Sequence, residues 1–119
     1  MRDRMRDAHG GKSERVDIKQ DPGGLVDVEF IVQYLVLAHA ATHGELTGNL
    51  GNIALLGIAA RLGLIDTALA ERVRSAYRDY RRRQHALRLN NLPSKVHPDE
   101  VAHHAAAVRM LWAQVLPSI

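Results

Sequence analysis

The sequence of 119 residues contains no cysteine and no apolar run long enough to cross a membrane. Without cysteine there is no disulfide, no thiol nucleophile and no thiolate metal site, which fits a reducing compartment and makes the cytoplasm the expected location. The most apolar stretch, residues 30–41, is interrupted by Gln33 and His39 and is shorter than the ~20 residues of a membrane span. The charged N-terminus lacks the apolar segment of a signal peptide, so we expect neither export nor a membrane partner.

Aromatic residues are also scarce, at 4% of the chain, whereas 46% of the residues are hydrophobic and 24% are charged. Alanine and leucine are abundant, which favours helices that pack through aliphatic side chains. A chain of this length suits one domain with its own core. The composition excludes intrinsic disorder and a collagen-like chain.

Basic residues are concentrated in one segment, although the net charge of the chain is only +3. Residues 71–88 hold seven arginines against Glu71 and Asp79. A protein that binds nucleic acid in a groove usually spreads lysine and arginine over a whole face. This local distribution counts against a nucleic-acid partner.

The spacing of apolar residues predicts four helices joined by short connections. The first is apolar almost all round its helical wheel, so we expect it to be central. The expected helices span residues 25–43, 53–62, 67–89 and 98–116. An all-α fold, an antiparallel up-and-down bundle of these four helices, is the most economical arrangement.

Local signals indicate where these elements begin. Asn49 or Asn52 is suited to cap the second helix, and Asp66 or Thr67 the third. Ahead of the bundle, residues 16–19 alternate as a short strand would. We interpret residues 1–16 as the tail of an upstream linking helix and a loop, and residues 17–119 as the helical bundle domain.

A turn before the first helix combines a cation with two glycines. Lys19 precedes Gly23 and Gly24, which follow a proline. Glycines let a backbone approach a phosphate closely, and a helix N-terminus presents free amides to it. The turn is therefore suited to bind an anion or a nucleotide.

Two carboxylates, Asp27 and Glu29, follow in the first turn and a half of the helix. Side chains two residues apart on a helix point about 200° from each other, so we expect them to serve different neighbours. A structural alternative is that Asp27 offsets the helix dipole or pairs with Lys19, while the glycines only make the turn. Glu29 fits that alternative less well, because it shares a side with Gln33 on an otherwise apolar helix. An absent domain packed there would explain it.

These residues also carry a family resemblance. The pattern consists of Lys19, Gly23, Gly24, Leu25, Asp27, Val28, Glu29 and Phe30. It resembles the signature of the bifunctional glutamine-synthetase adenylyltransferase/adenylyl-removing enzymes and is similar to a motif of the PII uridylyltransferases. Further similar positions are Tyr77, Tyr80, Arg81, Gln84, His85 and Leu87. The region around Trp112 resembles the C-terminal end of the family's chains.

The resemblance implies a helical domain that follows a nucleotidyltransferase domain of the DNA-polymerase-β type. The parent enzyme would transfer AMP from ATP to a tyrosine of glutamine synthetase and remove it, which regulates nitrogen assimilation. In that family a Gly-Ser and an Asp-x-Asp motif hold Mg²⁺ and ATP, and neither motif occurs in this sequence. We therefore expect no catalytic residue here, but a substrate-positioning and regulatory role. The implied partners are glutamine synthetase, the PII signalling protein and the adjoining nucleotidyltransferase domain.

A basic stripe lies along the helix expected over residues 67–89. Its members fall within about 80° of arc and are Arg74, Arg78, Arg81, His85 and Arg88. The resemblance singles out Arg81 and His85, so the candidate contacts to nucleotide or substrate are Lys19, Gly23, Gly24, Asp27, Glu29, Arg81 and His85. An alternative is a stand-alone module whose basic stripe holds an acidic protein or RNA. A third interpretation is a spacer without a ligand.

Histidines could also indicate a metal site. His39 and His43 are four residues apart and would share one side of a helix. No glutamate lies between them, and no third ligand is evident. We therefore expect no metal site in this chain.

Overall fold

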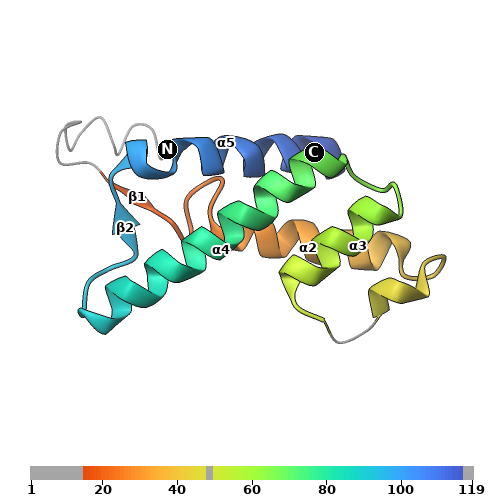
Figure 1. The fold of residues 1–119 in the computed structure, drawn as a ribbon, viewed down its shortest axis with the longest axis horizontal. Helices are drawn as coiled ribbons and strands as arrows, with labels where there is room; N and C mark the ends of the chain where they lie inside the picture. The colour runs from red at the N-terminus through yellow and green to blue at the C-terminus, as the bar shows by residue number, and fades with distance from the viewer. Residues whose placement is uncertain (1–14, 48–49, 117–119) are drawn as a thin grey trace.

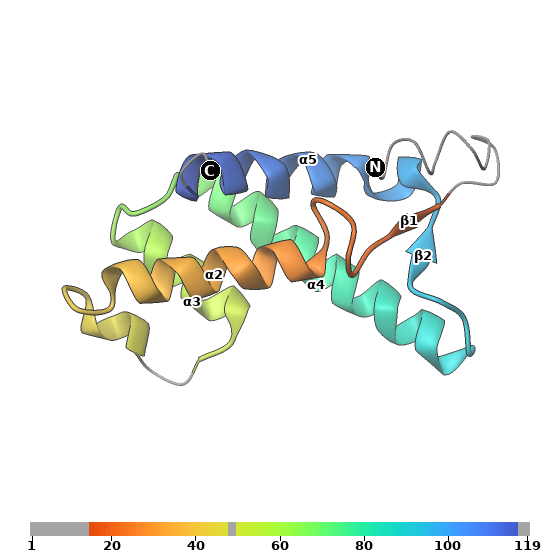
Figure 2. The same ribbon diagram turned by 180° about the vertical axis from the view of Figure 1, so that it is seen from behind.

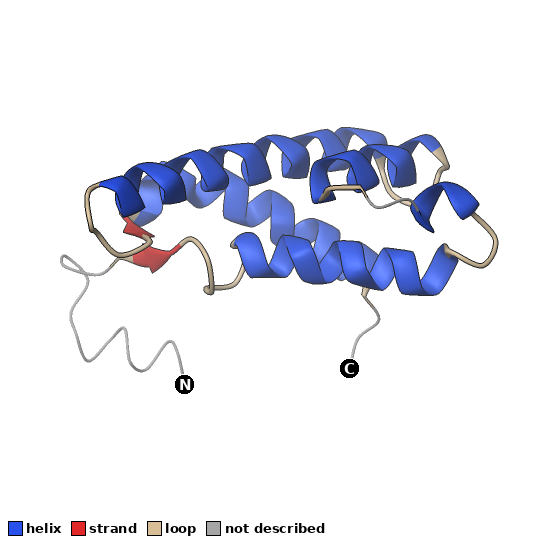
Figure 3. Cartoon of the chain, turned by 90° about the horizontal axis from the view of Figure 1, so that it is seen from below, coloured by secondary structure: helices blue, strands red, loops and turns tan. Residues whose placement is uncertain are grey.

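The structure, a computed structural model, describes residues 15–47 and 50–116 of the chain. Helices dominate it, and a two-stranded ribbon lies at one end (Figures 1 and 3). In chain order the elements are β1 (Val16–Asp17), α2 (Leu25–His39), a 3₁₀ turn (Gly44–Thr47), α3 (Asn52–Arg61), α4 (Thr67–Leu89), β2 (Lys95–Val96) and α5 (Pro98–Val115). The predicted all-α bundle of four main helices is confirmed.

Helix α4 makes the most extensive contacts of the bundle, with α5 and α3, and it also contacts α2. It runs opposite to α2, α3 and α5 (Figure 1). The connection after α2 returns across the molecule, so α2 and α3 point in the same general direction (Figure 2). β1 pairs antiparallel with β2, Val16 opposite Val96, which joins the start of the domain to the α4–α5 connection. Sequence analysis did not predict β2, and β1 is shorter than the predicted strand.

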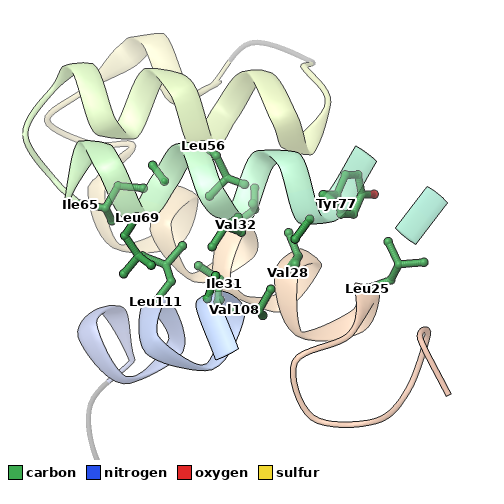
Figure 4. Packing of buried hydrophobic residues seen from close by; sticks show 14 of the residues in the cluster. Leu25, Val28, Ile31, Val32, Leu56, Ile65, Leu69, Tyr77, Val108 and Leu111 are labelled. Atoms are coloured by element: carbon green, nitrogen blue, oxygen red, sulfur yellow. The ribbon is translucent and has the colours of Figure 1, made fainter. Parts of the chain in front are cut away.

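The core is aliphatic and continuous through all four helices (Figure 4). Among the described residues, no polar or charged residue is fully buried. The largest completely enclosed side chains are Tyr80, Ile18, Ile31, Leu46, Leu56, Leu111, Val28, Val73 and Val108. This packing is what the scarcity of aromatic residues and the abundance of leucine and alanine predicted.

The prediction for α2 is wrong in two respects. The helix ends at His39 rather than at residue 43, and Gly44 begins the 3₁₀ turn. Although α2 contacts α3, α4 and α5, as a central helix should, it is not covered all round, because Val26, Phe30 and Leu37 are 42%, 55% and 81% exposed. We call these three residues the α2 apolar face.

Helix caps agree with the sequence for α4 but not for α3. Asp66 caps α4, since its Oδ2 accepts a hydrogen bond from the Leu69 amide at 2.8 Å. The N-cap of α3 is Gly51, and Asn52 is already helical, so the Asn52 cap is wrong. Asn49 and residues 1–14 lie outside the described residues. No helix in the described part is long and apolar enough to cross a membrane.

Candidate functional site

The turn between β1 and α2 is held by its own acidic side chains. Asp17 Oδ1 accepts hydrogen bonds from the Lys19 and Gln20 amides at 2.9 and 3.2 Å. Asp21 Oδ2 accepts one from the Asp17 amide at 2.8 Å. The Leu25 amide, at the start of α2, donates to the Ile18 carbonyl at 2.8 Å. The turn is therefore fixed before any outside group binds.

Both glycines of the turn are required by close packing. Gly23 has a φ of +85°, and a Cβ there would lie 2.8 Å from the backbone and side chain of Ala105 on α5. A Cβ on Gly24 would lie 2.6 Å from the carbonyl oxygen of Ile18. The Gly23 amide donates to Asp27 Oδ2 at 2.7 Å, and the Gly24 amide donates to the Asp21 carbonyl at 2.9 Å. These amides are used inside the turn, so an outside ligand would meet its side chains first.

Glu29 points away from this turn, toward α3 and α4. Its Oε2 lies 3.4 Å from the hydroxyl of Tyr77 on α4. The same hydroxyl accepts a hydrogen bond from Asn52 Nδ2 at 2.9 Å and lies 3.4 Å from Arg81 Nη1. The Arg81 guanidinium carbon is 5.8 Å from the centre of the Tyr77 ring. We call these four residues the Tyr77 cluster.

The donors and acceptors of the Tyr77 cluster match one another. A phenolic hydroxyl has one proton to donate and can accept two hydrogen bonds. Arg81 can only donate and the Glu29 carboxylate can only accept, so the Tyr77 proton points to Glu29. The remaining acceptor position takes the Asn52 amide nitrogen. Figure 4 shows the Tyr77 ring at the edge of the core with its oxygen directed away from Leu56 and Val32.

A second tyrosine, Tyr80, lies three residues further along α4 and contacts the β1–α2 turn and α5. Its hydroxyl donates to the Gly23 carbonyl at 2.7 Å, and its ring meets His104 of α5 edge-on with ring centres 5.5 Å apart. Burial, and then the nearby charge of Asp27, raise the pKa of the Tyr80 hydroxyl well above its usual range. Tyr80 therefore stays neutral and fastens the turn to α4.

His104 continues this buried arrangement into an ion-pair network. Its Nε2 lies 2.9 Å from Asp79 Oδ2, which also accepts from Arg83 Nε at 2.7 Å. Asp79 pairs with Arg82 as well, so its charge is shared between two arginines. Burial, followed by the charges of His103, Arg83 and Arg82, lowers the pKa of His104 to about 4. At neutral pH His104 is uncharged and donates its proton to Asp79.

The predicted basic stripe on α4 divides into two parts. Arg74 is half-buried, donates to the Ile53 carbonyl at 3.0 Å and pairs with Glu71 at 2.6 Å, so it serves the contact between α3 and α4. Arg78, His85 and Arg88 are exposed on the C-terminal part of α4. Only this part, together with Arg81, is available to an outside anion.

The α2 apolar face extends onto α5. The ring of Phe30 stacks on that of Trp112, with centres 5.4 Å apart and planes 21° from parallel. A cavity of about 380 Å³ beside this pair is lined by Pro22, Asp27, Arg109 and Trp112. Apolar surface therefore continues from the outer side of α2 to the C-terminal half of α5.

Comparison with known proteins places this arrangement in a family. The family model described as GlnD PII-uridylyltransferase matches residues 1–95. The chain belongs to this family. The match includes the β1–α2 turn, the whole Tyr77 cluster and the exposed part of α4.

Members of the family from several bacteria are similar over nearly the whole chain. The bifunctional glutamine synthetase adenylyltransferase/adenylyl-removing enzyme of Aromatoleum aromaticum is 61% identical over 99% of this chain. The enzymes of the same name from Chromobacterium violaceum and Bordetella bronchiseptica are 55% and 51% identical over 97% and 98% of it. The chain spans only 12–13% of the length of these relatives. The resemblance stated from the sequence is confirmed.

The predicted site residues of this family member fall into two groups. Lys19, Gly23, Gly24 and Asp27 share the turn, where the last three serve packing and hydrogen bonding. Glu29 and Arg81, far apart in the sequence, meet at Tyr77. The roles of both groups, and of His85, as contacts to a nucleotide or substrate stay predictions.

The two carboxylates have different neighbours, as their angular separation predicted. Asp27 Oδ2 holds the Gly23 amide, and Glu29 Oε2 lies near the Tyr77 hydroxyl. The suggested pairing of Asp27 with Lys19 is wrong, because no ion pair joins them among the described residues, and the Lys19 side chain is exposed.

Sequence reasoning missed Asn52 and Tyr77 as members of the site. Asn52 was considered as a cap and, like Tyr77, as a position similar to the family, and neither was predicted to contact the site. The signal available in the sequence was a tyrosine on an arginine-rich helix, because a tyrosine hydroxyl needs a partner when its ring is buried. In the structure the Tyr77 ring is buried, with 4% of its surface exposed.

The described residues contain no group of three or more histidine, aspartate or glutamate side chains that could hold a metal ion. The rings of His39 and His43 are 6.4 Å apart with no third ligand beside them. A Mg²⁺ site with three or more such side chains as ligands is therefore absent from the described residues.

Proposed function

We propose that this chain is a helical domain of an enzyme that adenylylates and deadenylylates glutamine synthetase, and that it positions substrate and transmits regulation. The names of its relatives support that activity for the parent enzyme. Because the chain spans 12–13% of those relatives, the catalytic nucleotidyltransferase core would lie elsewhere in the parent chain. ATP, Mg²⁺ and the transferred AMP would be held there.

The Tyr77 cluster is the observation that carries this proposal. It sets one exposed carboxylate, Glu29, and one exposed guanidinium, Arg81, around a single hydroxyl. Both contacts are 3.4 Å long, which is longer than a strong hydrogen bond, so both charged groups keep bonding capacity for an outside partner. A purely structural pair would gain more from a short, direct contact.

This pairing of charges suits the transfer of a nucleotidyl group. Such reactions depend mainly on positioning and on neutralising the charge that develops on phosphate oxygens. The Arg81 guanidinium can bind a phosphate oxygen in a bidentate manner, and the Glu29 carboxylate can accept a hydrogen bond from a sugar or tyrosine hydroxyl. His85, four residues after Arg81 on α4, would add a donor at the edge of the same site, and Lys19 would add one from the β1–α2 turn.

The α2 apolar face gives the remainder of the parent a place to pack. Leu37 and Phe30 are large apolar side chains that monomeric surfaces do not usually gather along one helix. Glu29 lies beside this face, so a domain packed on it would come close to the Tyr77 cluster. Glutamine synthetase and the PII signalling protein would then be partners of the assembled enzyme.

The experiment is AMP transfer to glutamine synthetase by the full-length parent enzyme carrying Glu29→Gln. Glutamine keeps the size of the side chain but removes the charge, so we expect at least about a tenfold slower transfer with unchanged thermal unfolding. Glu45→Gln is the matched control, because Glu45 is an exposed carboxylate on the 3₁₀ turn. Wild-type transfer by the Glu29 variant would favour the spacer interpretation, and a wild-type parent without transfer activity would reject the proposed function.

A further inference from the structure

We infer that Tyr77 is a positioning residue, which orients Arg81 and Glu29 toward substrate through its hydroxyl. This inference rests on the proposed function and deepens it by assigning a role to a residue that does not itself reach the surface. The ring of Tyr77 is buried, with 4% of its surface exposed, so Tyr77 can act on the charged side chains mainly through its hydroxyl.

The packing of the ring fixes the position of that oxygen. Tyr77 belongs to the core cluster together with Leu25 and Val28 of α2 (Figure 4). Asn52, in the first turn of α3, then donates to the oxygen at 2.9 Å, the shortest contact of the cluster. Helices α2, α3 and α4 therefore determine where the hydroxyl lies, and the side chains of Glu29 and Arg81 orient around it.

Arg81 has few other restraints. It is exposed on α4, and the described contacts of its guanidinium are the Tyr77 hydroxyl and the Tyr77 ring, four residues earlier. An exposed arginine samples many rotamers. Restricting it to one rotamer when substrate binds costs conformational entropy, and this cost weakens catalysis. Contacts of Arg81 with both the ring and the hydroxyl of Tyr77 reduce the number of rotamers that Arg81 samples before substrate binds. Glu29 is restrained in the same way by the hydroxyl proton.

The test is Tyr77→Phe in the full-length enzyme, because this change removes the hydroxyl and leaves the packed ring. We expect AMP transfer to glutamine synthetase to fall about tenfold, mainly in kcat, with the KM for ATP nearly unchanged. Tyr34→Phe is the matched control. Tyr34 is a half-buried tyrosine of α2 that packs against the core, and its hydroxyl has no hydrogen bond to another described residue.

A second variant separates positioning from a general structural effect. If Tyr77 acts through Arg81, its removal should matter little once Arg81 is already changed, so Tyr77→Phe combined with Arg81→Lys should lose less activity than the product of the two single losses. Wild-type kcat in Tyr77→Phe, or losses that multiply independently in the double variant, would overturn the inference.

The outcomes also separate this inference from the proposed function. Slow transfer by Glu29→Gln together with normal transfer by Tyr77→Phe would reject only the role of Tyr77. Normal transfer by both Glu29→Gln and Arg81→Lys would reject the proposed site itself.

Discussion

Two tyrosines three residues apart on α4 have opposite surroundings. Tyr80 faces α5 and the β1–α2 turn, and its hydroxyl makes a 2.7 Å hydrogen bond to a backbone carbonyl. Tyr77 faces α2 and α3, and its hydroxyl lies 3.4 Å from each of two charged side chains whose ends are exposed. One helix thus carries a closed network around Tyr80 and an open one around Tyr77.

This difference separates structural from functional polar groups. Around Tyr80, the Tyr80 hydroxyl and His104 Nε2 each have an acceptor within the chain, and the lowered pKa of His104 follows mainly from burial. On the Tyr77 side the charged groups are left with spare hydrogen-bonding capacity. The closed side should therefore respond to substitution by losing stability, and the open side by losing activity.

A substitution at the most tightly packed point near Tyr80 should have the largest effect on the free energy of unfolding. Gly23→Ala introduces a Cβ that would lie 2.8 Å from Ala105 at a φ of +85°. Strain and overpacking together should cost about 3 kcal/mol of unfolding free energy, measured by chemical denaturation. Gly44→Ala should stay within about 0.5 kcal/mol, since nothing lies within 4 Å of a Cβ there. Equal effects of the two changes would contradict this packing.

Comparing the two hydroxyls directly should give an intermediate effect. Tyr80→Phe leaves the Gly23 carbonyl without its buried donor and should lower the unfolding free energy by about 1–2 kcal/mol. Tyr77→Phe should lower it by less than about 0.5 kcal/mol, because two of the three contacts of that hydroxyl are long and involve exposed groups. Denaturation of both variants under the same conditions measures the contrast, and the reverse order would refute it.

Acidification should have the smallest effect, again on the closed side. The pKa of His104 is about 4 in the folded chain, below the unfolded value of 6.5, so the unfolded chain binds the proton first. The stability from neutral His104 is complete above pH 6.5 and is lost as the pH falls toward 4, with a cost of about 1 kcal/mol after allowance for partial exposure. Melting temperatures at pH 7 and 4.5 should show a smaller decrease in His104→Gln than in the wild type. Equal decreases would show that His104 does not titrate as inferred.

The sequence predicted the elements better than their surroundings. Helix α4 could be placed at its N-terminus because Asp66 is a strong cap, and α5 because Pro98 fixes a first turn. The wheel of α2 indicated burial all round, yet α3, α4 and α5 cover only part of it and leave Phe30 and Leu37 exposed. Periodicity shows which residues can be buried and does not show how many neighbours the fold provides.

The candidate site was predictable in part for the same reason. Glu29 and Arg81 could be singled out by residue type and by resemblance. Their meeting at Tyr77 depends on how α2 crosses α4, which no local pattern specifies. The use of the glycine amides inside the turn likewise depends on the side chains of Asp21 and Asp27 and on α5 lying against Gly23.

The contact of Gly23 with Ala105 has a consequence for how such sequences diverge. Any side chain at position 23 would displace α5, because a Cβ there would lie 2.8 Å from the Cα and the carbonyl oxygen of Ala105. Both atoms belong to the backbone, so no substitution at position 105 would relieve the contact. Among aligned relatives, position 23 should therefore remain glycine whichever residue occupies position 105 in the last described helix.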